Sequence, residues 1–153
     1  MKETFKGFVD EYRFLSNFYE MPFFVDNIMY KTVEHFYQSQ KTHNNKEKKR
    51  IIEAHSPFFA KKYGMCCTLR KDWEDVKTDV MYKGLCAKFS QNSVLCVWLR
   101  NTEDTRLVEY NHWGDTYWGV DFELGGKNVL GRLLMDIRQD TTILRKVSVS
   151  NLS

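Results

Sequence analysis

Apolar residues recur at helical spacing between positions 130 and 137, and this pattern constrains the fold more than any other. Leu130, Leu133, Leu134 and Ile137 stand at i, i+3, i+4 and i+7, which places them along one face of an α-helix. An apolar helical face has to be buried against other elements. The chain is therefore expected to fold around packed helices.

The rest of the chain predicts an α+β domain that is predominantly helical. Its 153 residues, of which 42% are hydrophobic, suit one domain over residues 1–153. We expect a core over about 5–139 and a C-terminal tail over 140–153. A few short antiparallel strands should accompany the helices. Strands are predicted at 4–9, near Val108 and in a hairpin over 23–30. A loop is predicted at 11–19. Further helices are predicted over 44–54, 56–64, 72–89 and 94–99.

The net charge and the cysteines indicate which partners and which cellular compartment to expect. A net charge of +3 fits an anionic small molecule or an occasional nucleic-acid contact without predicting either. The first residues contain no apolar signal segment and no run reaches bilayer length, so a cytoplasmic protein without a membrane partner is expected. Four cysteines without a C-x-x-C pair predict neither zinc nor disulfides, and we expect them to be small buried hydrophobes. The sequence does not indicate an oligomeric state.

The segment 30–41 carries the most suggestive chemistry. Thr32 is a predicted N-cap, and on the helix that follows, Glu34, Gln38 and Lys41 fall at i, i+4 and i+7. A fixed carboxylate with donors beside it suits a site where positive charge develops on a substrate. The alternative is an amphipathic helix whose Glu and Lys side chains face water.

Further polar and aromatic clusters lie at 15–19, at Glu109 and at 115–119. Asn17 in an aromatic loop can hydrogen-bond the edge of a stacked base, or it is an ordinary turn residue. Asp115 can equally be a turn cap and Trp118 an ordinary core residue. Asn128 and Gly131 near a helix start can hold an anion on backbone amides, or Gly131 simply allows close packing.

Taken in order, these motifs resemble the NADAR family, also called YbiA-like. The resemblance rests on Leu-Ser-Asn-Phe-Tyr at 15–19, Tyr-x-x-Val-Glu-His-Phe-Tyr-Gln-x-x-Lys at 30–41, Leu-Val-Glu at 107–109, Asp-x-x-Trp-Gly at 115–119 and Gly-x-Asn-x-Leu-Gly-x-Leu-Leu-Met-x-x-Arg at 126–138. It implies an N-glycosidase that acts on ribosyl-phosphate or ADP-ribosyl N-glycosides. The resemblance implies a substrate that is either an early riboflavin-pathway intermediate or ADP-ribosylated guanine in nucleic acid.

The resemblance and the chemistry together suggest roles for individual residues. Glu34 would stabilise the cationic ribose or activate water, and Asp115 or Lys41 would assist the leaving base. Lys41 could instead form a Schiff base or bind phosphate. No cofactor and no metal are expected. The substrate-binding residues would be Asn17, Phe18, Trp73, Lys88, Trp118, Gly119 and Asn128. Lys88 or Arg138 could contact phosphate, although an arginine in a last helical turn is more often a partner of the helix dipole.

Two readings from other classes remain open at this level. The same pocket could belong to a non-catalytic module that binds ADP-ribose or nucleotides. The basic run 46–50 could instead contact nucleic acid, with a steep dependence on salt.

Overall fold

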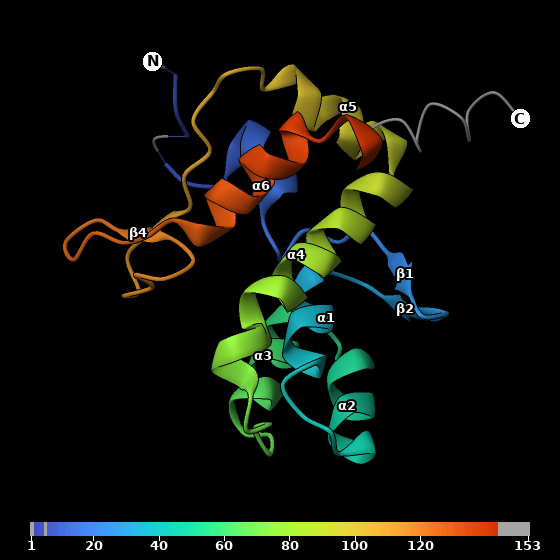
Figure 1. Cartoon of the computed structure of the whole chain (residues 1–153). Helices are drawn as coiled ribbons and strands as arrows, with labels where there is room; N and C mark the ends of the chain where they lie inside the picture. Colours follow the sequence, from blue (N-terminus) through green and yellow to red (C-terminus); the bar gives the residue numbers. More distant parts are fainter. Residues whose placement is uncertain (1, 5, 144–153) are drawn as a thin grey trace, which may run out of the picture. The chain divides into compact units, whose positions relative to one another are not determined.

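A computed structural model describes residues 2–4 and 6–143 (Figure 1). The chain forms two units: the middle unit of residues 17–91, and the terminal unit of residues 1–16 and 92–153. Each is described by itself. In the described residues, no helix combines the length and the apolar character needed to cross a membrane.

Helix α1 (Val33–Ser39) is the core helix of the middle unit. All seven of its residues are buried. Three helices pack against it, as Figure 1 shows: α2 (Asn45–Ile52), α3 (Pro57–Met65) and α4 (Trp73–Gln91). A helix surrounded in this way obtains its stability from packing rather than from intrinsic propensity.

A hairpin of β1 (Phe23–Val25) and β2 (Ile28–Tyr30) leads into α1. The strands pair antiparallel, and Asp26 and Asn27 form the turn with positive φ values of 51° and 65°. Such φ values suit Asn and Asp better than most residues. The hairpin prediction is therefore confirmed. Phe23 and Tyr30 then pack their rings against Phe36 of α1.

Helices α1, α2 and α3 begin at capping residues, and the predicted N-cap Thr32 is confirmed. The Thr32 hydroxyl accepts a hydrogen bond from the His35 N–H at 3.1 Å, and Asn44 and Ser56 cap α2 and α3 in the same manner. Each cap satisfies an amide that the first helical turn would leave without a partner.

The terminal unit holds the 3₁₀ helix η1 (Asp10–Leu15) and the helices α5 (Ser93–Asn101) and α6 (Val129–Gln139). Two short strands, β3 (Tyr110–Asn111) and β4 (Val120–Asp121), complete it. The apolar stripe of α6 is confirmed, since Leu130, Leu134 and Ile137 are buried.

The structure confirms the predominantly helical α+β class and corrects several details. No strand forms at 4–9 among the described residues, and η1 occupies most of the predicted loop at 11–19. Strands β3 and β4 pair parallel rather than antiparallel. Of the four cysteines only Cys96 is buried, while Cys66 is exposed. The tail is described only up to residue 143, and the prediction of one domain over 1–153 stays a prediction.

Candidate functional site

The carboxylate of Glu34 lies in the first turn of α1 and is almost entirely removed from solvent, with 7% of the residue exposed. Its Oε1 accepts a hydrogen bond from Gln38 Nε2 at 2.7 Å. Its backbone N–H donates to the Asn17 carbonyl at 3.1 Å. The alternative of a water-facing helix is therefore wrong for Glu34.

Gln38 is oriented by Glu34, because the amide nitrogen has to face the carboxylate in order to donate. This leaves Gln38 Oε1 buried and without a hydrogen-bond partner among the described residues. Gly64 of α3 lies directly against that oxygen, and a Cβ at position 64 would overlap it. A buried acceptor without a donor is costly, so this oxygen is suited to receive a hydrogen bond from a ligand.

Lys41 lies beyond the end of α1, so its predicted place on the helix at i+7 is wrong, yet it stays near Glu34. Its carbonyl accepts from the Arg70 N–H at 2.7 Å. Its Nζ lies 5.6 Å from the ring centre of Tyr37 and 6.0 Å from that of Trp73. Burial lowers the pKa of Lys41, and the negative charge of Glu34 partly opposes this shift.

Asn17, like Gln38, has a buried side-chain oxygen without a hydrogen-bond partner among the described residues. This oxygen is Oδ1, and Nδ2 of the same amide donates only a weak hydrogen bond to the Met81 sulfur at 3.5 Å. The adjacent Phe18 is 42% exposed. We call Asn17, Glu34, Gln38 and Lys41 the Glu34 cluster.

Two other predicted ligands of the middle unit are buried. Trp73 packs against Tyr37 with ring centres 5.1 Å apart. Lys88 of α4 is 1% exposed, and its Nζ lies 5.8 Å from the centre of the Tyr19 ring. Burial lowers the pKa of Lys88 to about 7. A lysine whose pKa is lowered this far is typical of functional sites, although structural networks also produce such shifts.

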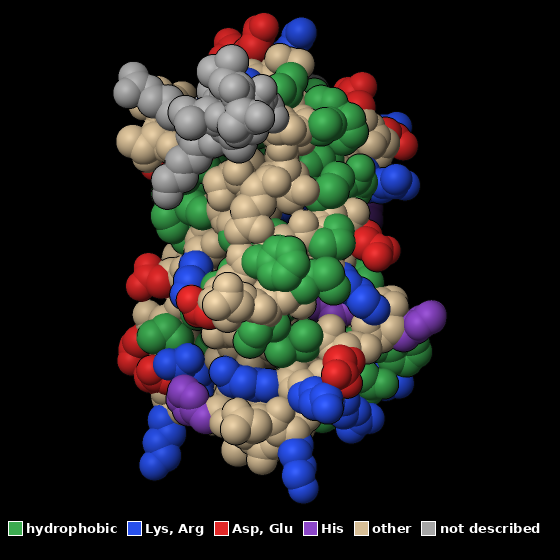
Figure 2. All heavy atoms as spheres, turned by 90° about the vertical axis from the view of Figure 1, so that its right-hand side faces the viewer, with side chains coloured by type: hydrophobic (Ala, Val, Ile, Leu, Met, Phe, Trp, Pro, Cys, Tyr) green, Lys and Arg blue, Asp and Glu red, His purple; other side chains and the backbone are tan. Residues whose placement is uncertain are grey.

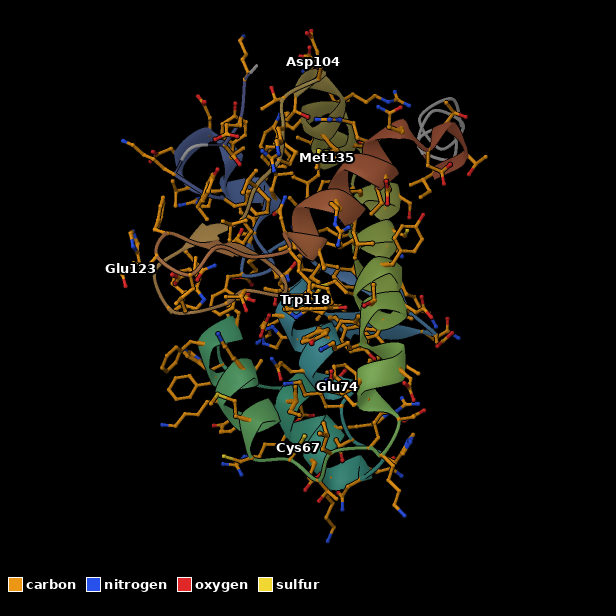
Figure 3. All side chains as sticks on the ribbon, turned by 60° about the vertical axis from the view of Figure 1, so that its left-hand side comes forward. Cys67, Glu74, Asp104, Trp118, Glu123 and Met135 are labelled. Atoms are coloured by element: carbon orange, nitrogen blue, oxygen red, sulfur yellow. The ribbon has the colours of Figure 1, made fainter. Side chains whose placement is uncertain are left out.

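The remaining predicted residues belong to the terminal unit, on the connection between β3 and α6 where Figure 3 labels Trp118. Asp115 Oδ1 accepts from the N–H groups of Tyr117 and Trp118 at 3.2 and 2.9 Å. This arrangement favours the turn-cap alternative for Asp115. Trp118 is half-buried and meets Tyr117 edge to face, and Gly119 packs tightly against the backbone of Glu109.

The hydrogen bonds at the start of α6 do not favour the predicted anion site. The amides of Asn128, Val129 and Leu130 donate to carbonyls of the preceding loop. The Asn128 side chain accepts from the Glu109 N–H at 3.0 Å and donates to the Leu107 carbonyl at 2.9 Å. A Cβ at Gly131 would overlap that carbonyl, which supports the close-packing alternative. A structural role is therefore favoured for Asn128.

Arg138 also has internal partners, because its Nη1 donates to Thr102 Oγ1 at 3.0 Å and to the Thr105 carbonyl at 2.7 Å. These bonds tie α6 to the segment after α5. They favour a structural role over phosphate binding.

Sequence reasoning did not name Gln38 as a site residue, although its i+4 spacing from Glu34 is visible in the sequence. The sequence marks Glu109 as a polar position but predicts no role for it. Its burial and the nearby Asp115 charge raise the pKa of Glu109 to about 7. A pattern of residue types carries no signal for such a shift.

The basic run on α2 is solvent-exposed at Lys46, Lys49 and Arg50. Figure 2 shows Lys and Arg side chains gathered at the lower end of the view, the level at which α2 lies in Figure 1. The Arg50 guanidinium lies 4.0 Å from the centre of the Tyr63 ring. Nucleic-acid binding through this surface stays a prediction.

The model of the NADAR domain family matches residues 4–142. The chain belongs to this family. Its NADAR domain is 39% identical to N-glycosidase YbiA of Escherichia coli over 94% of this chain and 92% of that protein. The solved structure of E. coli YbiA superposes with a TM-score of 0.83 at 39% identity, covering 95% of this chain and 89% of the other.

Two more distant relatives extend this picture. The NADAR domain is 35% identical to N-glycosidase Npun_R5314 of Nostoc punctiforme over 84% of this chain and 85% of that protein. It is 33% identical to riboflavin biosynthesis protein VVA0006 of Vibrio vulnificus over 86% of this chain but only 36% of that longer protein. The family therefore includes named N-glycosidases.

Proposed function

We propose that this NADAR domain is an N-glycosidase that hydrolyses the C1′–N bond of a ribosyl-phosphate or ADP-ribosyl substrate. The observation that carries the proposal is the buried Glu34 carboxylate, with acceptor oxygens of Asn17 and Gln38 that lack donors among the described residues. Ribose hydroxyls are donors that would satisfy such acceptors. The names of the relatives support the same reaction class.

Cleavage of an N-glycosidic bond builds positive charge on the ribose ring, as glycoside hydrolysis does. In the proposed reaction, Glu34 faces that charge and accepts a proton from the attacking water, whose oxygen forms the new bond to C1′. The bond electrons leave with the base nitrogen, which then takes up a proton. Gln38 holds the carboxylate in place through its 2.7 Å hydrogen bond.

We propose that Lys41 donates the proton that the leaving base nitrogen takes up. Its pKa is lowered by burial, so its proton is released more easily than that of an exposed lysine. The Asp115 Oδ1 already accepts two backbone hydrogen bonds. The Schiff-base alternative for Lys41 makes a different prediction, because borohydride would then trap a covalent adduct during turnover.

Two candidate substrate classes can be distinguished by experiment. The riboflavin name of one relative favours a ribosyl-phosphate intermediate of that pathway, and ADP-ribosylated guanine is the second candidate. Product release should be measured with both, using the wild-type protein and Glu34→Gln. Glu53→Gln is a suitable control because Glu53 is an exposed carboxylate.

We expect the wild type and Glu53→Gln to release ribose phosphate or ADP-ribose, and Glu34→Gln to lose at least 100-fold in kcat while it retains its circular dichroism spectrum. Unchanged turnover by Glu34→Gln would contradict the proposal. Tight ADP-ribose binding by the wild type, without turnover of either substrate, would instead establish the non-catalytic binding module.

A further inference from the structure

The terminal unit contains a pocket that shares no residue with the Glu34 cluster. Its volume is about 430 Å³, within the range of small-molecule sites. Five of its ten lining residues carry rings, and polar side chains lie beside them. The lining residues used below are Lys6, Glu109, His112, Trp113 and Phe122.

Stacked rings form one wall of this pocket. Phe122 lies parallel to Tyr110, with ring centres 5.2 Å apart and planes at 17°. It also stacks with His112 at 4.3 Å and 26°. Phe122 is 49% exposed and Trp113 is 66% exposed. Large aromatic surfaces left open beside a cavity are typical of sites that stack a flat ligand.

The Glu109 carboxyl supplies the polar contact. Its Oε2 is buried and has no hydrogen-bond partner among the described residues. Burial, with a smaller effect from Asp115, raises the pKa of Glu109 to about 7. At neutral pH a large share of this side chain is therefore the neutral acid, which can donate its O–H to a ring nitrogen or carbonyl. The exposed Lys6 adds a positive charge to the lining.

We propose that this pocket binds a planar heteroaromatic ring, which stacks on the Phe122 wall and accepts a hydrogen bond from the Glu109 carboxyl. A phosphate attached to the ligand would be attracted by Lys6. This proposal goes beyond the N-glycosidase function and stands without it, because every residue that it uses lies in the terminal unit.

The test uses indole N–H signals in two-dimensional NMR of the full chain. Trp113 reports on this pocket, and Trp73 reports on the surroundings of Lys41. Both signals are assigned with Trp→Phe variants. The probes are AMP, GMP, UMP and FMN, with ribose 5-phosphate as the control that lacks a ring. Titrations are made in the Glu34→Gln background so that no probe is consumed.

We expect at least one ring-bearing probe to shift the Trp113 signal saturably, while ribose 5-phosphate leaves it unmoved. Phe122→Leu removes the flat face at a half-exposed position and should weaken binding about tenfold, in line with the loss of one stacking contact. Phe58→Leu is the matched control, since Phe58 is 61% exposed and does not line the pocket. It should leave the affinity unchanged.

The pH dependence checks the role of Glu109. Because the donor is the protonated acid, affinity should fall as pH rises through about 7, whereas Glu109→Gln, whose amide donates at every pH, should bind without this fall. The proposal is overturned if no probe shifts Trp113, if ribose 5-phosphate acts like the nucleotides, or if Phe122→Leu and Glu109→Gln behave as the parent does. Failure of the N-glycosidase proposal appears separately, as absent turnover by the wild type.

Discussion

Gly64 is the residue on which the geometry of Gln38 depends most directly. Gly64 is the last residue of the predicted helix over 56–64, and the structure places it in the last turn of α3, against the Gln38 side chain. A packing requirement of this kind arises between segments that are distant in sequence, so local patterns do not reveal it. The i+4 pair of Glu34 and Gln38, in contrast, follows from helical spacing alone.

Gly64→Ala should therefore damage the site more than the fold. The added methyl would overlap Gln38 Oε1, displace the amide and break its hydrogen bond to Glu34. We expect a loss in kcat on the order of tenfold to 100-fold from the misplaced carboxylate, with a cooperative thermal transition retained. Lys62→Ala, at an exposed position of the same helix, tests whether helix propensity alone matters. A full-rate Gly64→Ala protein would show that Gln38 does not position Glu34.

At the scale of single elements, the start of α1 was the most predictable part of the chain. Thr32 caps α1, and it also hydrogen-bonds His35 Nδ1 at 2.8 Å. His35 Nε2 reaches the Ala54 carbonyl at 3.0 Å, so Nε2 carries the proton and Nδ1 accepts from the threonine hydroxyl. Burial lowers the pKa of His35, in keeping with a neutral structural histidine. The local sequence predicts the Thr32 cap. It does not predict the hydrogen bond from His35 to the Ala54 carbonyl, because Ala54 lies 19 residues away in sequence.

Thr32→Ala is expected to cost about 1–2 kcal/mol of unfolding free energy, because it removes the cap and leaves His35 Nδ1 buried without its donor. Urea titration followed by tryptophan fluorescence measures this quantity. Thr32→Ser retains the hydroxyl and should restore most of the stability. If the serine and alanine variants are equally stable, the hydroxyl does not have the role described.

At the scale of the whole molecule, the sequence predicted a predominantly helical chain but not its buried charges. Lys88 and Glu109 look like surface residues in a one-dimensional pattern, since lysine and glutamate are seldom fully buried. Only the packing around α4 buries Lys88, and only the packing beside Gly119 buries the Oε2 atom of Glu109. The resulting pKa shifts depend on burial by segments that are far away in sequence, which is why the candidate site was predicted less completely than the fold.

The pKa shifts of Lys88 and Glu109 predict that the free energy of unfolding changes with pH in opposite directions for the two residues. The folded protein lowers the pKa of Lys88 from 10.5 to about 7, so its burial is costly below pH 7 and the cost fades as pH rises towards 10.5. It raises the pKa of Glu109 from 4.5 to about 7, so that cost grows between pH 4.5 and 7 and is complete above pH 7.

Lys88→Met should therefore add about 1–4 kcal/mol of unfolding free energy at pH 6 and progressively less from pH 7 to 10. Glu109→Gln should add little at pH 4.5 and about 1–3 kcal/mol at pH 8. Chemical denaturation at a series of pH values gives both difference curves. A difference that stays constant with pH for either variant would show that the group is not titrating in the folded state as described.

The complete burial of α1 has a consequence for how activity is gained and lost. Its amide hydrogens have no route to solvent other than disruption of the surrounding helices, so hydrogen–deuterium exchange along α1 should report global opening of the middle unit. The helix that carries Glu34 cannot become ordered ahead of its neighbours. Positioning of the Glu34 carboxylate and folding of the middle unit are then a single event, so under the proposed function partly folded molecules should have no residual turnover.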